Sequence, residues 1–63
     1  MENEVINIMK NMESIFESAA TDATKFAEGN NSAGTRIRKA MQSVKTMAQG
    51  IRVEVQEQKN AAF

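Results

Sequence analysis

Two glycines and three cations lie close together in the middle of this 63-residue chain, in the stretch EGNNSAGTRIRKA. Gly29 and Gly34 have the spacing of a phosphate-binding loop, in which backbone N–H groups and a lysine surround a nucleotide's phosphates. Thr35 and Arg36 stand where that loop needs lysine and a hydroxyl, and the preceding ESAATDATKFAE has helical spacing rather than the β-branched run of a strand. The pattern therefore argues against a nucleotide loop, and the glycines need another role.

Other kinds of site chemistry find little support in the composition. The chain has neither histidine nor cysteine, which excludes ordinary zinc sites, disulfides and nucleophiles activated by histidine. Glu13 and Glu17 share a helix face, as do Glu54 and Glu57, but surface carboxylates without a pocket are usually solvated. We expect no enzyme activity, no metal and no cofactor, and we expect the methionines and phenylalanines to pack.

The elements that position the glycines and cations are predicted to be two helices. Alanine, methionine, glutamate, glutamine and lysine are plentiful and proline is absent, a mixture that favours helix. Apolar residues recur at spacings of three and four in two stripes. The first stripe is Val5, Ile8, Met9, Met12, Ile15, Phe16, Ala19, Ala23 and Phe26; the second is Ala33, Ile37, Ala40, Met41, Val44, Met47, Ala48, Ile51 and Val55. The pattern predicts one all-α domain, residues 1–63, with a helix over about 2–28, a turn at about 29–31 and a helix over about 32–58.

The stretch EGNN is predicted to be the turn. Gly29 suits the left-handed residue that follows a helix C-terminus, and Asn30, Asn31 or Ser32 can cap the second helix. A connection this short makes the two helices antiparallel neighbours. The predicted fold is therefore an antiparallel helical hairpin.

Two features of the second half oppose a continuous helix. Gly34 and Gly50 each cost about 1 kcal/mol relative to alanine inside a helix, and at Gly34 we expect another backbone to approach closely. The stretch GIRVEVQ alternates Ile51, Val53 and Val55 as a half-buried strand would. A lone strand has no partner in so short a chain, so helix is the preferred interpretation and strand the alternative.

A single hairpin leaves much of each apolar stripe in water, and a chain of this size buries little apolar surface. We therefore expect a homodimer that forms an antiparallel four-helix bundle, with small alanines where helices come close. No apolar run approaches the roughly 20 residues of a membrane span, and the start MENEVINIMK is acidic, unlike a signal peptide. The expectation is a soluble, cytoplasmic protein without a membrane or small-molecule partner.

The charges are divided between the two halves although they cancel overall. Residues 1–28 hold six acidic and two basic side chains, a net −4, and residues 29–63 hold six basic and two acidic, a net +4. Four cations recur every seven residues and form a basic ridge at intervals of roughly 10 Å along the second helix. The basic ridge consists of Arg38, Lys45, Arg52 and Lys59, and it is widened at its start by Arg36 and Lys39.

The divided charges have two explanations. Attraction between the two helices and ordinary solvated faces explain most such patterns. However, cations in the first turns of a helix oppose its dipole, so Arg36, Arg38 and Lys39 are poor choices for stability alone. An anion at the turn, held by free N–H groups and guanidinium groups, would favour cations at these three positions. Such an anion could be a nucleic-acid phosphate or a carboxylate of a partner protein.

The segments GNNSAGTRIRKA and VKTMAQGIRVEVQE resemble the histone H1-like Hc1 proteins of bacteria. The core segment of that family reads Gly-Asn, small residues, Gly-Thr-Arg-x-Arg-Lys-Ala, then a helix ending in an Arg- and Val-rich stretch. The resemblance is clear over residues 29–57, whereas the acidic first helix matches only in length and pattern. It implies a helical, nucleoid-associated, DNA-binding protein, with Arg36, Arg38 and Lys39 in the family's basic segment and Arg52 at its later arginine position.

The sequence also departs from the family. Many relatives are strongly basic or carry a long tail rich in lysine and alanine, while this sequence has no net charge and stops at QKNAAF; Asn31 stands where relatives often have lysine. With no aromatic residue among the basic positions, only non-specific contact with the DNA backbone is supported. The expected DNA-binding residues are Arg36, Arg38, Lys39, Lys45 and Arg52. The alternative is a helical assembly or adaptor protein, with a viral or phage origin as one option, whose acidic and basic faces dock against proteins.

Overall fold

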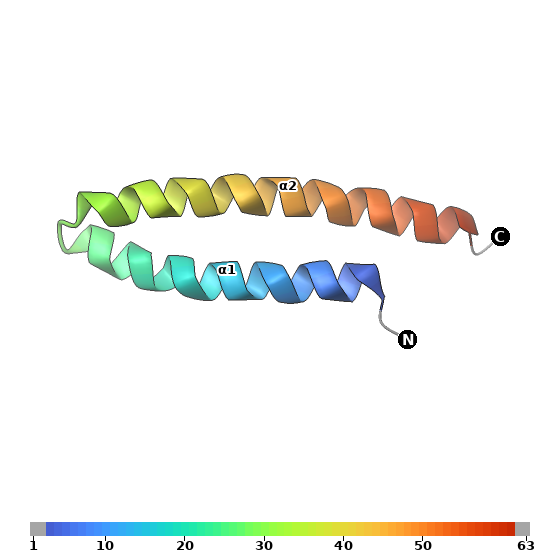
Figure 1. Cartoon of the computed structure of the whole chain (residues 1–63), viewed down its shortest axis with the longest axis horizontal. Helices are drawn as coiled ribbons and strands as arrows, with labels where there is room; N and C mark the ends of the chain where they lie inside the picture. The colour runs from blue at the N-terminus through green and yellow to red at the C-terminus, as the bar shows by residue number, and fades with distance from the viewer. Residues whose placement is uncertain (1–2, 62–63) are drawn as a thin grey trace.

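Two long helices and a three-residue connection make up the computed structural model, which describes residues 3–61 (Figure 1). Helix α1 spans Glu4–Ala27 and helix α2 spans Asn31–Ala61. The helices run side by side in opposite directions as a flat hairpin of about 52 × 19 × 11 Å, and α2 extends past the start of α1 (Figure 1). The all-helical prediction is confirmed, since residues 3–61 contain no strand and GIRVEVQ lies within α2.

The helix ends differ slightly from the predicted bounds. The predicted start at residue 2 lies outside the described residues; Asn3 caps α1, and its side-chain oxygen accepts a hydrogen bond from the Val5 N–H at 2.8 Å. The Asn3 amide also exchanges two hydrogen bonds with the amide of Gln58, at 2.6 and 3.0 Å, which joins the start of α1 to α2. Helix α2 runs three residues past the predicted end, because no glycine or proline follows Lys59 to stop it.

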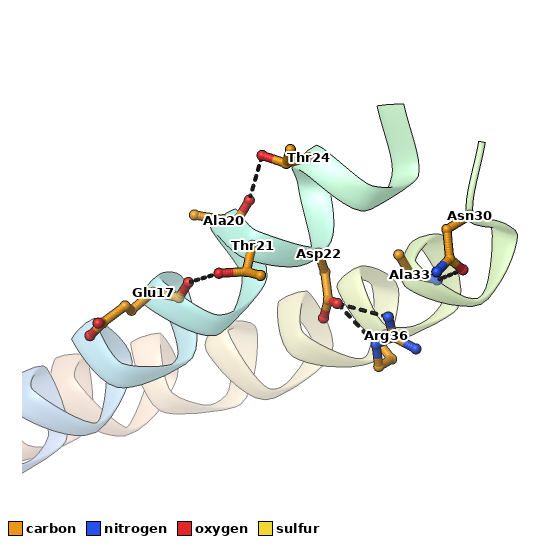
Figure 2. A network of polar contacts seen from close by, with 8 residues as sticks. All are labelled: Glu17, Ala20, Thr21, Asp22, Thr24, Asn30, Ala33 and Arg36. Atoms are coloured by element: carbon orange, nitrogen blue, oxygen red, sulfur yellow. Dashed lines mark hydrogen bonds and ion pairs between the residues drawn. The ribbon is translucent and has the colours of Figure 1, made fainter. Parts of the chain in front are cut away.

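The turn has the geometry that its sequence predicts. Gly29 has φ of +102°, in the left-handed region that suits glycine. Its N–H donates to the Phe26 carbonyl at 3.0 Å, and the Asn30 N–H donates to the Lys25 carbonyl at 3.0 Å, which together form a Schellman motif. Of the three candidate caps, Asn30 is the one used: its side-chain oxygen accepts from the Ala33 N–H at 3.1 Å (Figure 2).

The contact between the helices is a seam of residues spaced three and four apart. The half-buried or buried members are Val5, Ile8, Met12, Ile15, Ala19 and Asp22 of α1 and Ala33, Ile37, Ala40, Val44, Met47 and Ile51 of α2. Within residues 3–61 only Ala19 and Ala33 are buried, and Ala19 keeps 8% of its surface exposed. A single hairpin therefore shields its seam incompletely, as expected for two helices that cannot enclose each other.

A second set of apolar side chains lies on one broad surface of the hairpin, here called the apolar face: Met9, Phe16, Phe26, Met41 and Val55, which are 39–52% exposed. Met9 and Phe16 each follow a seam residue of α1 by one position, as Met41 follows Ala40 in α2. In an antiparallel pair of helices, positions with this relation to the seam point to the same side. The other broad surface is polar, with a hollow lined by side chains from both helices that include Ser14, Ser18, Lys39 and Ser43.

Gly34 lies under an aromatic ring. A β-carbon at this position would come within 2.7 Å of Cε1 and 2.8 Å of Cδ1 of Phe26, whereas a β-carbon at Gly50 would lie an ordinary 3.9 Å from Cδ1 of Ile8. The close approach expected at Gly34 is therefore present. A side chain makes it rather than a second backbone.

Candidate nucleic-acid interface

The basic ridge is a straight row on the outside of α2. Arg38, Lys45, Arg52 and Lys59 are all exposed and lie seven residues, or roughly 10 Å, apart. None of these four lies within ion-pair distance of a carboxylate among residues 3–61. Within the described residues, the four side chains are therefore exposed and outside any ion pair.

Uncharged polar side chains separate the cations of the ridge. Gln42, Gln49 and Thr46 line a shallow, open hollow together with Lys45 and Arg52. Amide and hydroxyl groups donate hydrogen bonds to phosphate oxygens without adding charge. Further along α2, Arg52 lines a second open hollow that also contains Glu57, so the acidic character rises toward the C-terminal end of the ridge.

At its start the ridge broadens. Arg38 and Lys39 line the same open hollow with Thr35 and Gln42. The ring of Phe26 borders a neighbouring hollow together with Gly34, Ile37 and Arg38. An exposed aromatic ring therefore lies beside the first cation of the ridge, although the sequence shows no aromatic residue among the basic positions.

Arg36 lies apart from the ridge and reaches across to α1. Its Nη2 and Nε lie 2.9 and 3.0 Å from one carboxylate oxygen of Asp22, as Figure 2 shows. Arg36 and Arg38 are two residues apart in a helix, so they point about 200° away from each other. Lys39 lies between them: it lines one hollow with Arg38 and another with Arg36 and Asp22. Because Arg36 and Arg38 point to opposite sides, the three cations do not converge at the turn.

The ion pair stabilises the charged forms of both partners. The hydrogen bond from Arg36 holds the pKa of Asp22 below its usual value of 3.8, and the same bond raises the pKa of Arg36. Sequence analysis missed Asp22 as a partner, although a signal was present: Asp22 and Arg36 each lie seven residues from Gly29. In an antiparallel hairpin, residues equally far from the turn lie at the same level.

Two kinds of site are absent from the described part of the chain. Among residues 3–61, no group of three or more acidic, histidine or cysteine side chains could hold a metal ion. Over the same residues, neither helix combines the length and apolar character that crossing a bilayer requires.

Comparison with known proteins gives one family. The family model described as histone H1-like protein Hc1 matches residues 6–61, which include nearly all of both helices. No curated protein matches the chain, and no solved structure matches it. The match extends the resemblance of residues 29–57 through the acidic first helix.

Proposed function

The chain belongs to the histone H1-like Hc1 family, and on that premise we propose that it is a small histone-like, DNA-binding protein associated with the nucleoid. Its contact is with the phosphate backbone and does not depend on base sequence. The ligands in this proposal are Arg38, Lys39, Lys45, Arg52 and Lys59. Arg36, the other cation expected to bind DNA, is paired with Asp22 and points away from the ridge, so it is left out of the set.

The basic ridge is the observation that carries this proposal. Its four cations span about 30 Å, which equals roughly nine base pairs at 3.4 Å each. Arginine, lysine and glutamine side chains in such a row can each bind a phosphate group of the DNA backbone. Contacts to phosphates do not distinguish one base from another. The acidic side chains gather on α1, so a chain without net charge still presents a cationic edge.

Two copies would supply two ridges. We propose that the protein forms a homodimeric four-helix bundle, which provides both the second ridge and additional stability. The apolar side chains that are half exposed in one hairpin would be removed from water in the bundle. One hairpin with five phosphate contacts predicts a plot of log affinity against log salt with a slope of about −4 to −5, and a dimer that engages both ridges doubles the slope.

The test is fluorescence anisotropy of a labelled duplex of arbitrary sequence, titrated with protein at several salt concentrations. The variant Arg52→Gln, Lys59→Gln removes two ridge charges, and Lys10→Gln, Lys25→Gln is the matched control because it removes two exposed charges from α1. The ridge variant should flatten the salt slope by about 2 per hairpin, whereas the control should retain the slope. Equal losses in both variants would mean that only total charge matters, and no binding at low salt would refute DNA binding.

The apolar face favours a second candidate, a helical assembly or adaptor protein. Its members are 39–52% exposed in a single hairpin, and exposed apolar patches mark protein interaction sites. Under this function the acidic and basic sides select the partner by charge. A protein that ignores duplex DNA at low salt but forms a stable complex with another protein through Phe16 and Met41 would support the adaptor.

A further inference from the structure

The apolar face continues into a second three-four seam on α1. The exposed positions at these spacings are Ile6, Met9, Glu13, Phe16, Ala20, Ala23 and Ala27. Glu13 is the only charged residue among them. A helix with one seam toward α2 and another toward solvent has the pattern of a helix that contacts two neighbours.

The corresponding line on α2 has a different composition. Its positions are Gly34, Arg38, Met41, Lys45, Ala48, Arg52, Val55 and Lys59, so apolar or small residues alternate with the cations of the basic ridge. The α1 half of the surface is therefore apolar with one negative charge, and the α2 half is apolar with four positive charges. Glu13 is therefore complementary in charge to the α2 half, whereas two α2 halves would repel each other.

The register of the hairpin defines which residues lie at one level. Asp22 contacts Arg36, and the closest approach to Gly50 comes from Ile8, so the residue numbers at one level add to about 58. A two-fold axis parallel to the helices preserves these levels. It brings Glu13 of one copy opposite Lys45 of the other, Ala20 opposite Arg38, and Ile6 opposite Arg52.

We propose that a second copy of this chain covers the apolar face, with α1 of each copy on α2 of the other and both turns at the same end of the bundle. This inference rests on the dimer of the proposed function and adds its face, its orientation and its register. Glu13 pairs with Lys45 of the second copy at the rim, and the aliphatic stems of Arg38 and Arg52 lie over small or apolar residues while their charged heads stay in water.

The opposite orientation, with the turns at opposite ends, places α2 on α2. This orientation places the two basic ridges, eight cations in all, along a single seam. Like charges on two facing helices repel each other. Both orientations bring together the same broad surface of the hairpin, whose outline is at most 52 by 19 Å, so area does not distinguish them. Charge therefore selects the orientation.

Single cysteines test the orientation, because the natural chain has none. The variants Glu13→Cys and Lys45→Cys are prepared separately, mixed, allowed to exchange subunits and oxidised. Within one hairpin these positions lie on opposite outer edges of the apolar face, too far apart for a disulfide. The mixture should yield a covalent dimer that contains one copy of each variant, identified by mass, while each variant alone should remain largely uncrosslinked.

Two results would overturn the inference. Efficient crosslinking of Lys45→Cys with itself would show that α2 of one copy packs on α2 of the other. If the mixture gives no covalent dimer and the protein is a monomer in sedimentation equilibrium, no second copy covers the apolar face. DNA anisotropy measured on the natural chain separates this inference from the proposed function, because Lys45→Cys removes one cation of the basic ridge. Mixed crosslinking together with no DNA binding by the natural chain would uphold the orientation and refute DNA binding. DNA binding by the natural chain without mixed crosslinking would uphold the proposed function and refute the orientation.

Discussion

Replacing Gly34 with alanine tests the packing of the Phe26 ring against α2. Alanine inside a helix is more favourable than glycine by about 1 kcal/mol. The added β-carbon would, however, lie 2.7 Å from Cε1 of Phe26, about 1 Å inside an ordinary carbon contact. The ring has to move, and because it is 52% exposed it can swing into water.

The cost of this movement follows from the buried part of the ring. About half of the phenylalanine side chain is covered, which corresponds to roughly 1 kcal/mol of hydrophobic stabilisation. The loss offsets the gain from helix propensity, so Gly34→Ala alone should change the free energy of unfolding by only about 0.5 kcal/mol in either direction. With Phe26→Ala already in place, the same substitution should stabilise the protein by the full amount, about 1 kcal/mol.

The assay is urea unfolding of the four members of this double-mutant cycle, followed by circular dichroism at one fixed protein concentration. The expected coupling between positions 26 and 34 is about 1 kcal/mol. Gly50→Ala is the control, because its β-carbon would meet Ile8 at an ordinary 3.9 Å; it should stabilise the protein equally with and without Phe26. If Gly34→Ala stabilised both backgrounds equally, the ring would not rest on Gly34 and the described packing would be refuted.

Three further predictions concern the turn, the ion pair and the apolar face. Gly29→Ala should lower the free energy of unfolding by about 1 to 2 kcal/mol in urea titrations, since φ is +102° there, and an unchanged midpoint would contradict the left-handed turn. Because the pKa of Asp22 is lowered in the folded state, the ion pair with Arg36 stabilises the fold above pH 3.8, and this stabilisation is lost as the pH falls through the lowered pKa. The melting temperature of Asp22→Asn should therefore approach that of the natural protein in acid. A difference between the two melting temperatures that stays constant with pH would contradict this. Phe16→Lys should weaken dimerisation at least tenfold in sedimentation equilibrium while Ser18→Lys, on the polar surface, should not, and equal effects would mean that the apolar face is not the interface.

Local signals in the sequence predict the fold well because the forces that form it are local. Apolar spacing identifies both helices, and Gly29 marks the turn because only a residue without a β-carbon adopts its φ at little cost. The strand alternative for residues 50–56 fails because alternation over so few residues is weaker than the helical period that surrounds it.

The candidate site is predicted less completely, because it depends on relations between the helices. The period of seven in the basic ridge is visible in the sequence because all four of its cations lie on one helix. The position of Arg36 opposite Asp22, and the nearness of Phe26 to Arg38, depend on which residues meet across the turn. These pairs can be predicted only once the register of the two helices is known, and the amino-acid composition does not determine that register.

The short turn also orders the contacts by the length of chain that each one closes. Phe26 and Gly34 are eight residues apart, Asp22 and Arg36 are fourteen, and the amides of Asn3 and Gln58 are fifty-five. Closing a loop costs more entropy as the loop grows, so contacts beside the turn form at the smallest cost and each one shortens the loop that the next has to close. The hairpin is therefore suited to fold as a zipper from Gly29 outward, and its two free ends, which close last, are the first to separate when the protein opens.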